Sequence, residues 1–169
     1  MTASPLVVTL TVDQDTQDAW DAVRRTWFPP GRLVVGAHLT LFHALPGEFA
    51  GPVLADCSDV AGGTPAFSLA VAGVRSLGRG VALAVSAPEL PDLHATLRDR
   101  WRPWLTPQDR QPLRPHVTIQ NKVDAHVAAA TMRAVRGNFG PATARATGIA
   151  VWRYLGGPWE PVTVCRFRD

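Results

Sequence analysis

Two short segments of the sequence share one arrangement of residue types. His38-Leu39-Thr40-Leu41 and His116-Val117-Thr118-Ile119 both read histidine, apolar, threonine, apolar. Alternate side chains of a β-strand face the same side, so each segment presents an imidazole beside a hydroxyl and packs its apolar residues behind them. A lone His-x-Thr is common by chance, whereas two copies with matching apolar flanks indicate a paired site.

Two such pairs facing one another are suited to phosphate chemistry. A neutral imidazole accepts a proton from the attacking water or hydroxyl, and a protonated imidazole donates one to the leaving oxygen. Histidine suits both tasks because its ordinary pKa of ~6.5 lies near working pH. Threonine hydroxyls can donate hydrogen bonds to the phosphate oxygens, where negative charge builds up. The alternative is that His38 and His116 are structural histidines on half-buried strands.

The segments HLTLFHAL at 38–45 and RPHVTIQNKV at 114–123 resemble the motifs of the 2H phosphoesterases, specifically the bacterial 2'-5' RNA ligase-like (LigT-like) branch. The resemblance extends more loosely to the whole chain. It implies an α+β, bilobal, pseudo-symmetric fold in which two antiparallel sheets line a central cleft, with helices outside and one motif from each lobe. It also implies hydrolysis of 2',3'-cyclic phosphates on RNA or nucleotides without metal or ATP, and in some members reversible 2'-5' joining of RNA ends.

The resemblance also assigns roles to the motif residues. His38 and His116 are then the catalytic pair, and Thr40 and Thr118 bind the phosphate. In the direction of hydrolysis, His38 is expected to protonate the leaving oxygen and His116 to activate water. The two roles exchange if the direction of attack is reversed.

The chain departs from its relatives after the second motif. Relatives often carry an arginine there, whereas this chain reads Gln120-Asn121-Lys122. Strand parity places Gln120 and Lys122 on the face of His116, so Lys122, the one lysine of the chain, is expected to supply the positive charge. A lysine is a point charge rather than a bidentate fork, which puts substrate preference in question more than reaction class.

Other residues are candidates with open alternatives. Phe42 shares a strand face with Thr40 and is expected to form the floor of the cleft. Arg114 either contacts phosphate or is a solvated loop arginine. His43 should face away from His38 unless a bulge intervenes, and His94 and His126 are expected on helix surfaces.

An aromatic and basic group surrounds a Gly-Gly-Pro turn near the C-terminus. Trp152, Arg153, Tyr154 and Trp159 alternate ring and charge in a way that could stack a nucleobase and bind phosphate. Core packing of each tryptophan is an equal alternative.

Hydrophobic periodicity and turn residues predict the elements that must hold these residues. Strands are expected at 5–12, 34–45, 66–72, 74–77, 80–86, 116–122, 142–154 and 160–167, and helices at 15–27, within 48–60, at 89–102 and at 124–137. Residues 103–115 should form a loop. Strand, helix, strand therefore occurs early and again late, which favours α+β with mostly antiparallel strands. Residues 1–169 are expected to form a single domain of two lobes.

Composition limits the classes of function. Apolar residues make up 46% and charged residues 18% of the 169 residues, which indicates a globular chain. We expect a cytoplasmic monomer, because neither a signal peptide nor a membrane span is recognisable. The sequence contains no HExxH, cysteine–histidine cluster or phosphate-binding GxxxxGK[ST] loop, so neither a metal nor another cofactor is expected.

The charge distribution bears on the partner. Residues 85–169 carry 12 basic and 7 acidic side chains, against 5 and 7 in residues 1–84. A basic half suits an anionic partner such as RNA, and the resemblance implies RNA or a nucleotide with a 2',3'-cyclic phosphate. Two alternatives remain: a phosphodiesterase for a small cyclic nucleotide, of the ADP-ribose cyclic phosphate type, and an RNA-binding module without turnover.

Overall fold

The computed structural model describes residues 3–138 and 142–169, and its elements follow the predicted order. The strands are β1 (Leu6–Val12), β2 (Leu39–Leu45), β3 (Phe67–Ser76), β4 (Val81–Ser86), β5 (His116–Gln120), β6 (Ala142–Tyr154) and β7 (Trp159–Arg166), and the helices are α1 (Gln14–Trp27), α2 (Ala50–Gly62), α3 (Glu89–Trp101) and α4 (Ala125–Asn138). Three short 3-10 turns, at Pro30–Arg32, Gly47–Phe49 and Arg102–Trp104, link some of them. The predicted strands 66–72 and 74–77 are one strand, β3, whose pairing with β4 shifts register between Val71 and Gly73.

The strands among the described residues form one antiparallel sheet in the order β1-β2-β5-β4-β3-β6-β7. β1 also pairs with β6, so six of the strands close into a ring and β7 lies outside it along β6. The expectation of two separate sheets is therefore replaced by a single closed one. β2 and β5 are neighbours in this ring and meet at the pair Leu39–Val117.

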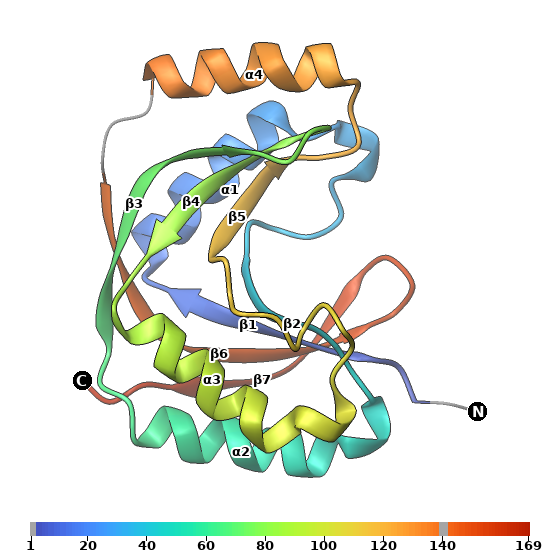
Figure 1. The fold of residues 1–169 in the computed structure, drawn as a ribbon, viewed down its shortest axis with the longest axis vertical. Helices are drawn as coiled ribbons and strands as arrows, with labels where there is room; N and C mark the ends of the chain where they lie inside the picture. Colours follow the sequence, from blue (N-terminus) through green and yellow to red (C-terminus); the bar gives the residue numbers. More distant parts are fainter. Residues whose placement is uncertain (1–2, 139–141) are drawn as a thin grey trace.

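The helices lie outside the ring in two groups. Figure 1 shows α4 above the end of β3 and β4, with α1 behind β5, while α2 and α3 lie side by side below β6 and β7. The apolar spacing of each helix explains its packing, since residues three and four apart share one face. In α3 this face consists of Leu90, Leu93, Leu97 and Trp101, all buried. None of the described helices has the length and apolarity needed to cross a membrane.

Asp13 begins α1 and also ties it to the sheet. Its carboxylate accepts hydrogen bonds from the backbone N–H of Thr16, which caps the helix, and from the backbone N–H of Arg145 in β6. The predicted helix began at Asp15, which lies instead inside the first turn. Because helix N-termini leave unpaired N–H groups, this cap contributes about 1 kcal/mol to stability.

Candidate active site

The two His-x-Thr motifs lie side by side because β2 and β5 are antiparallel neighbours. Leu39 pairs with Val117, and both side chains are fully buried beneath the sheet. Antiparallel register about this pair brings each motif histidine opposite the threonine of the other motif. The four polar side chains therefore converge on one side of the strand pair, as the alternation of the motifs predicts.

Both imidazoles are oriented in the same way. The Nδ1 atom of His38 lies 2.8 Å from the Gly36 carbonyl oxygen, and Nδ1 of His116 lies 2.7 Å from that of Arg114. A carbonyl oxygen can only accept, so Nδ1 carries the proton in each ring. Each Nε2 is then left for a ligand, as a proton acceptor when the ring is neutral and as a donor when it is charged.

Three polar residues of α1, spaced along one helix face, hold the segment that precedes His38. Gln17 Nε2 donates to the Ala37 carbonyl at 2.8 Å, and the Asp21 carboxylate accepts the Ala37 N–H at 2.8 Å. Arg24 donates through Nε to the Val35 carbonyl at 3.0 Å.

Arg24 also links the two motif strands. Its guanidinium donates to the Thr118 carbonyl at 2.6 Å, and its side chain is buried. One buried arginine therefore connects the segment that precedes His38 to β5, the strand that carries His116. A buried cation with its donors satisfied by carbonyls stabilises this junction, and its loss would leave those carbonyls unpaired.

A cavity of about 460 Å³ lies over the motif side chains. Its lining consists of Val7, His38, Thr40, His43, Leu77, His116, Thr118, Asn121 and Trp159. The centroids of the Trp159 and His38 rings are 4.6 Å apart, and the angle between the ring planes is 51°. The cavity thus combines two imidazoles and two hydroxyls with an aromatic wall, an arrangement able to bind a phosphate together with an attached base.

The environment of the cavity lowers the pKa of both motif histidines. Burial lowers the pKa of His38 to about 4, although its hydrogen bond to Gly36 opposes the shift. Burial also lowers the pKa of His116. Its hydrogen bond to the Arg114 carbonyl acts to raise this pKa, and the charge of Arg75 lowers it further. Both rings are therefore neutral in the empty cavity at pH 7, and a bound phosphate anion would favour their charged forms.

A bulge in β2 overturns the predicted position of Phe42. Val8 pairs with Phe42 but Thr9 pairs with Thr40, so Leu41 is an extra residue in the ladder. Leu41 and Phe42 are both buried as a result, and Phe42 does not form the floor of the cleft.

The same bulge accounts for two histidines. His43 regains the face of Thr40 and lines the cavity. His94, expected on a helix surface, is instead buried and stacks on Phe42 with ring centroids 4.6 Å apart. His126 is exposed on α4, as predicted.

The parity expected after His116 also ends early. β5 stops at Gln120, and its pairing with β4 shifts register there, since Val81 pairs with Gln120 but Ala82 pairs with Thr118. The Gln120 side chain is buried and its Nε2 donates to the Thr131 hydroxyl of α4 at 2.7 Å, so it cannot reach a phosphate in the cavity.

Lys122 lies outside this cavity. It occupies a turn with φ of 59°, is exposed, and does not belong to the cavity lining. Its backbone carbonyl accepts from Arg32. The left-handed turn breaks the strand alternation on which the expectation for Lys122 depended.

Two arginines lie beside His116 in an adjoining cavity of about 210 Å³. Arg75 and Arg114 line it together with Thr40, His43 and His116. This position keeps Arg114 within reach of a phosphate bound next to the motifs. Arg75 was not among the sequence candidates. Burial lowers its pKa, and the charge of Arg114 lowers it further.

The C-terminal aromatic and basic group divides on folding. Trp159 lines the motif cavity, and Trp152 lies behind it with ring centroids 6.0 Å apart and its Nε1 donating to Thr9 at 3.0 Å. Arg153 Nε lies 3.9 Å from Glu160 Oε1 across the β6–β7 hairpin, and Tyr154 is exposed on the same hairpin. The latter two flank the cavity wall without belonging to its lining.

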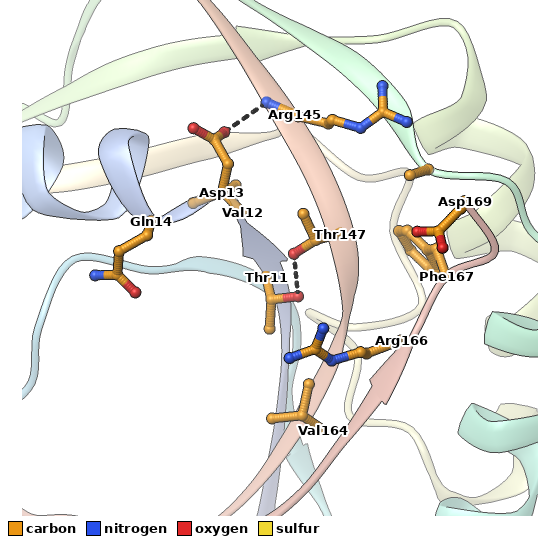
Figure 2. Close-up of a pocket in the computed structure, with 11 residues that line it drawn as sticks. Thr11, Val12, Asp13, Gln14, Arg145, Thr147, Val164, Arg166, Phe167 and Asp169 are labelled. Atoms are coloured by element: carbon orange, nitrogen blue, oxygen red, sulfur yellow. Dashed lines mark hydrogen bonds between the residues drawn. The ribbon is translucent and has the colours of Figure 1, made fainter.

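Another cavity, of about 410 Å³, lies away from the motifs where β1, β6 and β7 meet the start of α1. Figure 2 shows a hydrogen bond between the Thr11 and Thr147 hydroxyls, and another from the backbone N–H of Arg145 to the Asp13 carboxylate. Its lining contains no histidine, cysteine or lysine. Its titratable residues are Asp13, Arg145, Arg166 and Asp169, whereas the motif histidines line the cavity over β2 and β5.

Sequence reasoning missed Asp109, which binds His43 from the loop 103–115. The Asp109 side chain is 1% exposed, and its Oδ1 lies 2.9 Å from Nδ1 of His43. The signal available was a lone acid in an otherwise basic, proline-rich loop. Among the described residues, no three His, Cys, Asp or Glu side chains are arranged to hold a metal ion.

Comparisons with known proteins agree with the motif geometry. A profile of the 2'-5' RNA ligase superfamily matches residues 12–158 of the chain. Curated protein sequences give no significant match.

Solved structures give likenesses over nearly the entire chain. E. coli LigT complexed with 3'-AMP has a TM-score of 0.65 at 16% identity, covering 99% of each chain. E. coli LigT complexed with NADP+ has a TM-score of 0.68 at 16% identity, covering 100% of each chain. TT0787 of Thermus thermophilus has a TM-score of 0.66 at 16% identity, covering 98% of each chain. At these identities the likeness establishes a shared fold.

Proposed function

Because the chain belongs to the 2'-5' RNA ligase superfamily of 2H phosphoesterases, we propose that it is a metal-independent 2',3'-cyclic phosphodiesterase acting on RNA or nucleotide ends. The observation that carries the proposal is the convergence of His38, Thr40, His116 and Thr118 on one cavity, with both Nε2 atoms unused by the protein. Acid–base catalysis needs two titratable groups at one reacting centre, and the two imidazoles lining one cavity support the proposal that His38 and His116 are those groups.

The proposed reaction is the opening of the cyclic phosphate by water. Neutral His116 accepts a proton from the water as its oxygen bonds to phosphorus. The bond from phosphorus to the ribose 3' oxygen breaks, and protonated His38 gives its proton to that oxygen. The product is a 2'-phosphate with a free 3'-hydroxyl, and each ring ends in the other's starting state. The same steps, with a ribose 5'-hydroxyl in place of water, would join RNA ends in a 2'-5' linkage.

The electrostatics of the empty cavity support a substrate-assisted acid. The pKa of His38 is about 4 when the cavity is empty, so the charged ring is scarce at pH 7. A phosphate diester brings one negative charge against the ring and stabilises its charged form. Thr40 and Thr118 would donate hydrogen bonds to the oxygens on which the transition-state charge develops.

A small cyclic nucleotide is the second candidate substrate. The cavity of about 460 Å³ and the Trp159 wall suit one nucleotide, and E. coli LigT has been solved in complexes with 3'-AMP and with NADP+. The basic charge of residues 85–169 favours RNA.

The test is turnover of a 2',3'-cyclic dinucleotide in EDTA, followed by separation of 2'- and 3'-phosphate products. We expect hydrolysis to the 2'-phosphate by the wild-type protein and none by His38→Ala or His116→Ala. Binding without turnover would instead support an RNA-binding module. Comparing kcat/KM for a cyclic mononucleotide and a cyclic-ended oligonucleotide separates the two substrate classes.

A further inference from the structure

We infer that His43, oriented by Asp109, is a third substrate-binding histidine of this cavity and contacts the bound phosphate from the β2 side. The inference rests on the proposed function and adds to it a residue that the two His-x-Thr motifs do not contain. It comes from the bulge in β2, the position of Asp109, and the shared cavity.

The bulge places His43 among the motif side chains. Without the extra residue Leu41, strand alternation would turn His43 away from Thr40. With it, His43 lines the same cavity as His38 and His116 and has a side chain that is 43% exposed. Its charge also acts on both neighbours, since a charged His43 lowers the pKa of His38 and of His116.

Asp109 orients the ring. One carboxylate oxygen, Oδ2, accepts the backbone N–H groups of His43 and Ala44 at 2.8 and 3.1 Å. The other, Oδ1, lies 2.9 Å from Nδ1 of the His43 ring. Although burial raises the pKa of Asp109, its hydrogen bonds from His43 and Ala44 lower the pKa overall, so the carboxylate is charged. A charged carboxylate accepts the Nδ1 proton, which leaves Nε2 for the cavity.

Anchoring the loop does not explain the whole arrangement. The bonds from Oδ2 to two backbone N–H groups already fasten the loop 103–115 to β2, whatever side chain residue 43 carries. The Oδ1 bond serves the imidazole alone and holds its proton on Nδ1. His43 lines both the motif cavity and the adjoining cavity that holds Arg75 and Arg114, so its ring borders both.

Two substitutions separate this role from a structural one. His43→Gln keeps the backbone bonds to Asp109 but removes the imidazole ring. Asp109→Asn must turn its carbonyl oxygen to the same two N–H groups and its NH2 to His43, which forces the ring proton from Nδ1 to Nε2. His126→Gln on the outer surface of α4 is the matched control.

The measurements are steady-state kinetics on a 2',3'-cyclic dinucleotide, titration with inorganic phosphate followed by histidine ring NMR signals, and thermal unfolding. We expect His43→Gln to weaken phosphate binding and raise KM about tenfold or more, because charged hydrogen bonds to phosphate are among the strong ones. Asp109→Asn should show the Nε2–H tautomer and a similar loss. The unfolding temperature of His43→Gln and all properties of His126→Gln should match the wild type.

The result that would overturn the inference is an unshifted His43 ring signal at saturating phosphate, together with wild-type kinetics in His43→Gln. If no protein, wild type included, turned over the cyclic phosphate, the proposed reaction would fail. The phosphate titration would then still decide whether His43 binds the anion, since it needs no turnover.

Discussion

Leu39 of β2 and Val117 of β5 form the backbone pair that joins the two motif strands, and neither side chain is exposed to solvent. This pair connects β2 to β5 within the ring, and its two apolar side chains pack beneath the site. Antiparallel register about it relates the two motifs by an approximate twofold axis, so each histidine lies beside its own threonine and opposite the other. Residues far apart in the sequence thereby become one site.

The two motif histidines should be jointly required. His38→Ala and His116→Ala are each expected to lower kcat by at least ~10²–10⁴-fold, the usual cost of losing a general acid or base. The double variant should lose less than the product of the two single losses, because the rings act as a unit. Single-turnover rates and circular dichroism of the three variants check this. Substantial activity in a folded His116→Ala protein would contradict the mechanism.

The pH dependence should differ between free and bound enzyme. Because the pKa values of His38 and His116 are lowered, each ring loses its charge as pH rises, before pH reaches about 6.5. The value of kcat/KM, which reports the free enzyme, should therefore decline as pH rises from about 6 to about 8. The kcat profile should lie at higher pH, because the bound phosphate stabilises the charged ring. A kcat/KM optimum above about pH 8 would contradict this account.

A substrate with a good leaving group distinguishes the two roles. Bis(p-nitrophenyl) phosphate releases nitrophenolate, which needs no proton, so loss of the general acid should cost little with this compound. We expect His38→Ala to retain a much larger share of wild-type activity on it than on a cyclic phosphate, and His116→Ala to lose both. The converse pattern would assign the acid to His116.

Arg24 should matter for stability and for the site together. Arg24→Met removes the donors to the Val35 and Thr118 carbonyls, and an unpaired buried polar group costs about 1–3 kcal/mol. We expect a free energy of unfolding lower by about 2–4 kcal/mol and a reduced kcat. Arg25→Met, on the exposed side of the same helix, is the control and should unfold like the wild type. Urea unfolding of the two variants makes the comparison.

Two residues that strand parity assigned to substrate should prove unimportant for turnover. Lys122→Ala removes an exposed side chain outside the cavity, and Gln120→Leu replaces a buried amide whose Oε1 has no hydrogen-bond partner. Both variants are expected to keep kcat and KM within about twofold of the wild type. Because Gln120→Leu also removes the donor to the buried Thr131 hydroxyl, we expect its free energy of unfolding to be lower by about 1–3 kcal/mol. A tenfold rise in KM for Lys122→Ala would show that Lys122 contributes to substrate binding.

Local patterns in the sequence predicted most of the elements and the motif pair. Strand and helix positions follow from apolar spacing and turn residues, which act over a few neighbours. The convergence of His38 and Thr40, and of His116 and Thr118, follows from alternation within unbroken stretches of strand. These predictions depend on local geometry, so the sequence by itself was sufficient for them.

Tertiary structure decided what depends on register. The bulge at Leu41 and the shift beside Gln120 invert alternation, because one extra residue turns the side chains that follow it to the other face until the register shifts again. Phe42 and Gln120 were thereby buried, and His43 was turned into the cavity. Whether the strands formed two sheets or one ring depended on the pairing of β2 with β5 and β1 with β6, between segments far apart in the chain. Asp109 reaches His43 for the same reason: partners 66 residues apart meet through packing, on which local sequence carries no information.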